Sequence, residues 1–215
     1  MTDQGLKQSI LDELNWEPSV KAAHIGVSAR NGVVTLTGHV DSYPEKWAAE
    51  RCAQRVSGVK AVAEELEVRY AFSAGHADDE IAKRALQVLS WDILVPKDTV
   101  KIKVEKGWVT LTGDVNWFYQ KLNAEADVHK LHGVVGVSND IMIKPSVQPA
   151  DVRGKIETAL GRNAQIEAKG IAVTAEGGKV TLRGNVESFA ERNIAANTAW
   201  SAPGVTTVEN LVTVD

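Results

Sequence analysis

Two histidines form the clearest pair of side chains that could bind a metal ion. His129 and His132 lie three positions apart, so on a helix they would share one face. A zinc site needs further ligands, and Cys52, the single cysteine, offers no cluster to supply them. We therefore expect both histidines to be solvated near a helix C-terminus, where positive charge is favourable. The sequence predicts no metal site and no cofactor.

The sequence contains none of the common catalytic motifs. Nucleophilic and metal-assisted catalysis need a nucleophile, a base and an orienting group, yet no G-x-S-x-G, H-E-x-x-H, Walker or G-x-G-x-x-G pattern occurs. The run Gly177-Gly178-Lys179 is typical of a hairpin turn leading into a strand. The run Gly133-Val134-Val135-Gly136 imitates an RNA-binding loop, but a helix that ends at Gly133 explains it adequately. We predict that the protein is not an enzyme.

An aromatic triplet, Trp117-Phe118-Tyr119, is the best candidate for a binding surface. Tryptophan and tyrosine favour wet interfaces, with either a membrane or a protein. Trp108 lies on the same side as the threonines of a predicted strand and would extend this surface. Packing against a neighbouring unit explains the triplet equally well. Trp16 and Trp91 lie at equivalent positions just past a predicted helix, and we interpret both as packing residues.

These candidates lie on a unit that the chain repeats three times. Residues 34–40 read VTLTGHV, residues 109–115 read VTLTGDV and residues 180–186 read VTLRGNV. A second glycine lies six positions before each central glycine, and a third lies twenty positions after it. Fixed spacing of this kind indicates one small structural unit built three times. The repeated structural glycines are Gly32, Gly38, Gly58, Gly107, Gly113, Gly133, Gly178, Gly184 and Gly204.

Each unit predicts the element order αββαβ. Leu6, Ile10 and Leu14 have the spacing of an amphipathic helix, and alternating residues then predict a strand, a tight glycine turn and a returning strand. A second helix follows, with capping-box spacing at Ser42 and Glu45 and again at Ser188 and Glu191. A third strand closes the unit. The predicted fold class is α+β, with three tandem modules that each have a three-stranded mixed sheet and two helices on one face.

The repeat divides the chain into residues 1–72, 73–147 and 148–215, joined by linkers at 69–80 and 144–151. The net charge of −4 is spread evenly, so the basic footprint of a duplex binder is missing and we predict no nucleic-acid partner. The single cysteine fits a reducing compartment. Since neither a leader-like segment nor a run of bilayer length is visible, we expect a cytoplasmic protein.

The modules resemble the BON domain, a family named for bacterial osmotic-shock and nodulation proteins. The resemblance lies in residues 31–40 with Gly58-Val59, and in their equivalents at 107–115 with 133–134 and at 178–186 with 204–205. It implies small non-catalytic modules of stress-responsive bacterial proteins, thought to bind phospholipid membranes or other ligands. The third unit departs from this pattern at Arg183, which replaces a threonine.

Two functions follow as expectations from this resemblance. The first is a binding or scaffolding protein of the osmotic or envelope stress response, weakly attached to a phospholipid membrane or an envelope-associated protein partner, with the middle unit dominant. Tethering the modules would raise their effective concentration at such a surface. The alternative is a cytoplasmic sensor of a small ligand or of a monovalent cation such as potassium. A purely structural spacer is a third option.

Overall fold

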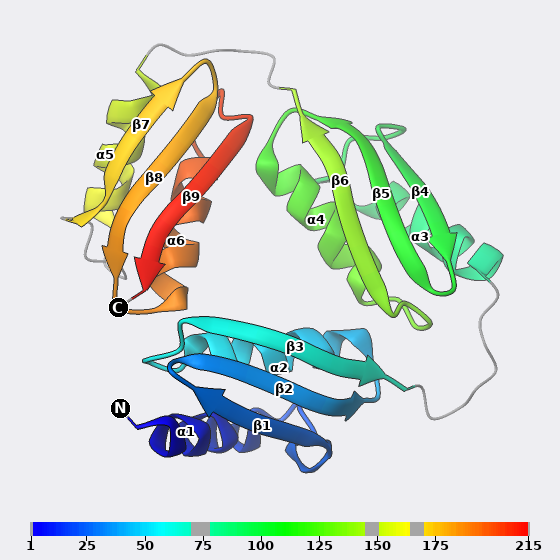
Figure 1. Cartoon of the computed structure of the whole chain (residues 1–215). Helices are drawn as coiled ribbons and strands as arrows, with labels where there is room; N and C mark the ends of the chain where they lie inside the picture. The colour runs from blue at the N-terminus through cyan, green and yellow to red at the C-terminus, as the bar shows by residue number, and fades with distance from the viewer. Residues whose placement is uncertain (1, 70–77, 145–150, 164–169, 215) are drawn as a thin grey trace.

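The computed structural model describes residues 2–69, 78–144, 151–163 and 170–214. Three αββαβ modules follow one another, and in each module both helices cover one face of a three-stranded sheet (Figure 1). The central strand of each sheet pairs antiparallel with the first strand and parallel with the third. The predicted α+β fold class is therefore confirmed. The predicted linkers fall largely on residues 70–77 and 145–150, which lie outside the described residues.

The three modules contain equivalent elements. Module 1 has α1 (Asp3–Trp16), the short helix η1 (Ala22–His24), β1 (Ile25–Arg30), β2 (Val33–Val40), α2 (Tyr43–Arg55) and β3 (Ala61–Val68). Module 2 has α3 (Asp78–Trp91), β4 (Val100–Glu105), β5 (Trp108–Val115), α4 (Phe118–His129) and β6 (Gly136–Ile143). Module 3 has α5 (Val152–Arg162), β7 (Ala172–Glu176), β8 (Lys179–Val186), α6 (Phe189–Trp200) and β9 (Thr207–Val214).

The apolar periodicity of the sequence decides which faces are buried. In α1 the buried residues are Leu6, Ile10 and Leu14, which form one stripe of the helix. In β2 the buried residues Val34 and Leu36 alternate with Thr35 and Thr37, so one face of the sheet packs on the helices. Each module thus encloses its own hydrophobic core between helices and sheet.

Two of the repeated glycines have a clear structural reason in the first module. Asn31 and Gly32 both have positive φ, of 53° and 82°, as a two-residue type I′ hairpin turn requires. Gly38, inside β2, also has a positive φ, and a Cβ atom there would lie 2.1 Å from the backbone oxygen of His24. The same close approach recurs in the other two modules at Gly113 and Gly184.

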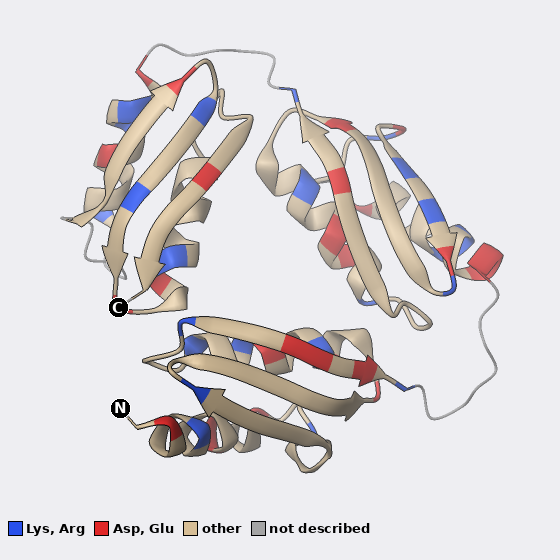
Figure 2. Ribbon diagram, in the orientation of Figure 1, with Lys and Arg blue, Asp and Glu red and all other residues tan. Residues whose placement is uncertain are grey.

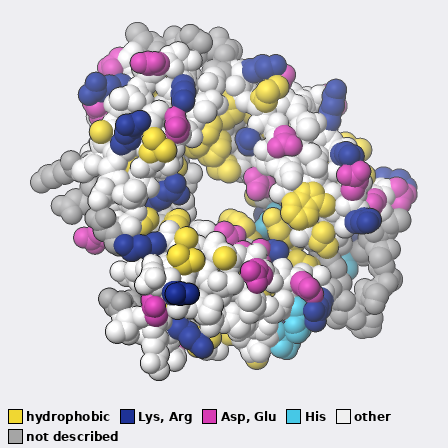
Figure 3. Space-filling model, in the orientation of Figure 1, with side chains coloured by type: hydrophobic (Ala, Val, Ile, Leu, Met, Phe, Trp, Pro, Cys, Tyr) yellow, Lys and Arg dark blue, Asp and Glu magenta, His cyan; other side chains and the backbone are white. Residues whose placement is uncertain are grey.

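The modules are arranged in a closed ring, which the sequence did not predict. Tyr43, at the start of α2, packs against the core of module 2, and Phe189, at the start of α6, packs against the core of module 1. Phe118, at the start of α4, stacks on Trp200 of module 3. One position of the repeat therefore makes all three contacts, which we name junctions 1–2, 2–3 and 3–1. Figure 3 shows an opening at the centre of the ring, with hydrophobic side chains gathered on its rim.

Candidate interaction surfaces

The aromatic triplet is divided between an internal contact and an exposed rim. The rings of Phe118 and Trp200 are stacked, with centroids 4.4 Å apart and planes 10° apart. Trp117 and Tyr119, on either side of Phe118, are 40% and 48% exposed. Phe118 thus packs on a neighbouring module, as the packing interpretation predicts, while its two neighbours face solvent and the binding role stays a prediction.

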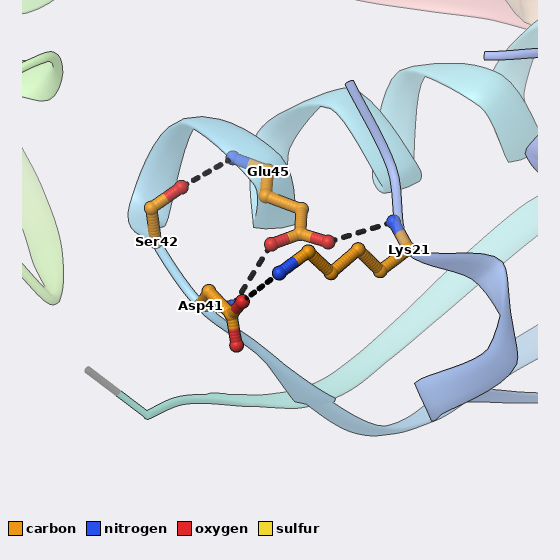
Figure 4. Close-up of polar contacts among 4 residues, drawn as sticks. All are labelled: Lys21, Asp41, Ser42 and Glu45. Atoms are coloured by element: carbon orange, nitrogen blue, oxygen red, sulfur yellow. Dashed lines mark hydrogen bonds and ion pairs between the residues drawn. The ribbon is translucent and has the colours of Figure 1, made fainter. Parts of the chain in front are cut away.

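The helix start that carries the triplet is held by a side chain unlike those of the other modules. In module 1, Ser42 Oγ accepts a hydrogen bond from the N–H of Glu45 at 3.3 Å, as the capping-box spacing predicts (Figure 4). The buried Glu45 carboxylate accepts from the N–H groups of Lys21 and Asp41, at 2.8 and 2.9 Å, and the Lys21 ammonium pairs with the Asp41 carboxylate. Module 3 repeats the serine contact between Ser188 and Glu191.

In module 2 this cap is rebuilt around an amide. The Gln120 Oε1 atom accepts from the N–H groups of Asn116 and Trp117, both at 3.0 Å. Gln120 is buried, so its side-chain oxygen gives the two N–H groups an acceptor where water is excluded. The N–H of Gln120, whose equivalent donates to a serine hydroxyl in the other modules, donates instead to the Trp117 backbone oxygen at 3.1 Å, so an exposed tryptophan occupies the N-cap position without a side-chain cap.

A groove of 520 Å³ lies beside the exposed part of the triplet, at junction 2–3. Helix α4 supplies one wall and the end of α6 supplies the other. None of the lining side chains carries a charge. They are Trp117, Phe118, Tyr119, Leu122, Asn197, Trp200 and Ser201.

Trp108 belongs to a different part of the module. It is the first residue of β5, whereas Trp117 lies two residues beyond the end of that strand, so roughly 20 Å or more of extended chain separates them. Its indole Nε1–H donates to Ser138 Oγ at 2.9 Å, and its ring lies so close to Gly136 that a Cβ atom there would be 2.4 Å from it. The structure therefore does not join Trp108 to the triplet, and the indole covers the start of β6.

A second exposed apolar surface, absent from our sequence-based candidates, follows the first helix of module 2. Trp91 is 76% exposed and Ile93 is 96% exposed, and Leu94 is also exposed. The Leu94 N–H donates to Asp92 Oδ1 at 2.8 Å, which fixes the turn and holds Ile93 outward. We name Trp91, Ile93 and Leu94 the apolar tip.

The interpretation of Trp16 and Trp91 as packing residues is wrong. Trp16 is 83% exposed, even more than Trp91. Each tryptophan lies two residues after the last buried residue of its helix, Leu14 or Leu89, which is about 200° around the helix axis. Helical geometry therefore turns both indoles away from the core.

His129 is not solvated, which corrects the expectation for that residue. It is buried at junction 1–2, with its ring centroid 4.6 Å from that of Tyr43 and 5.2 Å from that of Trp47. Burial lowers its pKa, and its Nε2 atom has no hydrogen-bond partner among the described residues. His132, three residues on, is exposed. The two histidines thus do not form a pair of ligands.

The rest of the described chain offers little reactive chemistry. Within the described residues, no group of three or more histidine, cysteine, aspartate or glutamate side chains could hold a metal ion. The Cys52 thiol is buried, and burial raises its pKa. Basic and acidic residues are interspersed over all three modules, as Figure 2 shows. Among the helices described, none is long and apolar enough to cross a bilayer.

These features define a tandem array of three small α+β modules with apolar surfaces on the second module and at its junction with the third. A family model described as the BON domain matches residues 2–70, 77–145 and 149–215, and the chain belongs to this family. The chain is 31% identical over 148 residues to osmotically-inducible protein Y of Escherichia coli strain K12, an alignment that covers 67% of this chain and 74% of that protein.

The solved structures that match the chain are more distant in sequence. One, described as CdsD, a structural protein of the type III secretion system of Chlamydia trachomatis, is 17% identical. The match covers 98% of this chain and 92% of that chain, with a TM-score of 0.27. A second structure, of the C-terminal domain of CdsD, is 16% identical over the full length of both chains, also with a TM-score of 0.27.

Proposed function

We propose that this chain is a non-catalytic protein that attaches to phospholipid surfaces through the apolar tip of its second module. The observation that supports the proposal is the exposure of Trp91, Ile93 and Leu94 on a turn that Asp92 holds in place. Transfer of an almost fully exposed isoleucine from water into an apolar environment lowers the free energy. Tryptophan beside it suits the boundary between headgroups and acyl chains.

The expected attachment is weak. Full burial of a large apolar side chain contributes about 1.5–3 kcal/mol, and part of three such contributions is lost to immobilisation at the surface. Asp92 lies within the tip, and Lys97 and Asp98 follow it, so the tip has no excess of basic residues. We therefore expect binding that depends on apolar insertion and only slightly on salt, since the attraction of basic clusters to anionic lipid is screened by ions.

The second module contributes most to this attachment. Module 1 has an exposed Trp16 at the equivalent position, but Pro18 and Ser19 stand where module 2 has Ile93 and Leu94. In module 3, residues 164–169 of the same loop lie outside the described residues. Because osmotically-inducible protein Y is a relative, we place the attachment in the response to osmotic or envelope stress.

Vesicle co-sedimentation tests the proposal. The full chain is mixed with vesicles of phosphatidylcholine and phosphatidylglycerol at several ionic strengths, beside the double variant Ile93→Ser, Leu94→Ser. We expect the variant to lose binding by about tenfold or more. The matched control is Leu211→Ser, which changes an exposed leucine on β9. Equal binding by the double variant and the unaltered chain would refute the role of the tip.

Cation sensing stays a prediction, because no cluster of described residues favours it. A potassium titration of the melting temperature would test it, since a ligand specific to the native state raises that temperature.

A further inference from the structure

The three junctions of the ring are built from equivalent positions but are filled differently. At junctions 1–2 and 2–3, the start of one module's second helix meets the end of the next module's second helix. At junction 3–1, Phe189 at the start of α6 packs against the core of module 1. The repeat places Trp47 of module 1, Leu122 of module 2 and Asn193 of module 3 at the same position. The three junctions can therefore be compared at one equivalent position, which carries a different side chain in each module.

Junction 1–2 shows what this position can hold. The Trp47 ring meets His129 of module 2 edge-on, with centroids 5.2 Å apart and an angle of 74° between the planes. The Arg51 guanidinium lies over the indole ring, 4.6 Å from the ring centroid. An indole therefore fills the space beside this junction, in contact with a ring of the next module and with a cation of its own helix.

Junction 2–3 lacks both of these large side chains. Leu122 stands in place of Trp47, and Ala126 stands in place of Arg51. The result is the uncharged groove described above, in which the stacked pair Phe118 and Trp200 is joined by Trp117 and Tyr119. Its volume falls within the range of small ligand sites, about 300–1,000 Å³.

We propose that the groove at junction 2–3 binds an aromatic side chain presented by a peptide segment of a partner protein. The indole of Trp47 at the equivalent junction is the model for the occupant, and Trp200 takes the place of His129 as the ring that receives it. The lining carries no charge, so a charged occupant would lose its hydration without compensation.

The polar groups of the groove suit a peptide backbone. Asn197 is exposed on the α6 wall, and its amide offers both a donor and an acceptor. The Ser201 hydroxyl donates to the Asn197 backbone oxygen at 2.7 Å, so the Ser201 oxygen keeps the capacity to accept a hydrogen bond from a ligand. None of these residues belongs to the apolar tip, so this inference does not depend on membrane attachment.

N-acetyl-tryptophanamide is a suitable probe, because it combines an indole with two peptide-like amides. We expect its titration into the ¹⁵N-labelled full chain to give saturable shifts of backbone amides at residues 117–122 and 197–201. N-acetyl-leucinamide, titrated in the same way, should bind about tenfold more weakly, because it cannot stack. Equal shifts from both probes would overturn the proposal by showing nonspecific apolar contact.

Leu122→Trp is the decisive variant, since it gives module 2 the side chain that fills junction 1–2. Leu122 is partly exposed, so the fold should tolerate the change, which the amide spectrum itself verifies. We expect the variant to bind the probe at least about tenfold more weakly, and the control Leu211→Ser to bind it normally. Unchanged binding by Leu122→Trp would overturn the site. Shifts at the groove on raising the protein concentration alone would also overturn it, by showing a second copy of the chain as occupant.

Discussion

Replacing Gly184 with alanine should strongly destabilise the third module. Gly184 lies in β8 with a φ of +141°, a conformation that L-residues rarely adopt. An added Cβ atom would lie 2.0 Å from the backbone oxygen of Gly170 and 3.2 Å from the Cα atom of Ile171. Both neighbours are backbone atoms and cannot move aside by rotating a side chain, so one segment must shift by about 1 Å to restore an ordinary C···O distance.

The expected cost is comparable with the whole stability of a module. Strained backbone at one residue costs about 1–3 kcal/mol, and overpacking typically adds about 1–3 kcal/mol. A module of this size, at roughly 0.05–0.15 kcal/mol per residue, has a free energy of unfolding of only about 3–10 kcal/mol. Since 1 kcal/mol shifts the melting temperature of a small domain by about 4–8 °C, we expect a fall of at least about 10 °C.

The same module supplies the control. Gly161, in α5, has open space where a Cβ atom would lie, so Gly161→Ala should stabilise the helix by up to about 1 kcal/mol. Circular dichroism melts of both variants measure the difference, and amide spectra show whether module 3 alone loses its dispersed signals. If Gly184→Ala melts within about 2 °C of the unaltered chain, the close approach of backbone at Gly184 is not rigid and the reasoning fails.

Three further predictions concern buried polar groups. Glu45→Ala leaves two backbone N–H groups without their acceptor, so the free energy of unfolding, measured in urea, should fall by about 2–4 kcal/mol. Glu45→Gln should cost less than half of that, because Gln120 makes the equivalent contact in module 2. Because burial keeps His129 neutral, this free energy should fall as the pH drops below about 6.5, and His129→Phe should reduce that slope. Burial and a neighbouring carboxylate raise the pKa of Asp127, so Asp127→Asn should raise the melting temperature at pH 7 but not near pH 3.5.

The fold of each module was predictable because local signals agree with one another. Asn31-Gly32 demands a two-residue turn, the alternation in residues 34–40 demands a half-buried strand, and Ser42 with Glu45 marks the start of a helix. Each signal acts over a few residues, and its recurrence at the same spacing in all three modules was enough to identify the element order. The exposure of Trp16 and Trp91 was within reach of the same reasoning, since helical spacing alone turns both away from Leu14 and Leu89.

The burial of His129 was not predictable in this way, because it depends on another module. His129 is the last residue of α4, where an isolated module would leave it in water. Tyr43 and Trp47 cover it because module 1 packs against module 2. Periodicity records which face of a helix meets its own sheet, and it contains no information about contacts between separate cores.

The closed ring also explains how three modules of one fold can differ at their surfaces. Each junction reuses one aromatic position, Tyr43, Phe118 or Phe189, so the ring is held by a feature that all modules share. The residues around that position are then free to differ without opening the ring. At junction 1–2 they fill the space with Trp47, and at junction 2–3 they leave it open, with aromatic walls and no charge. Repetition supplies the scaffold, and the departures from repetition are where a ligand should be sought.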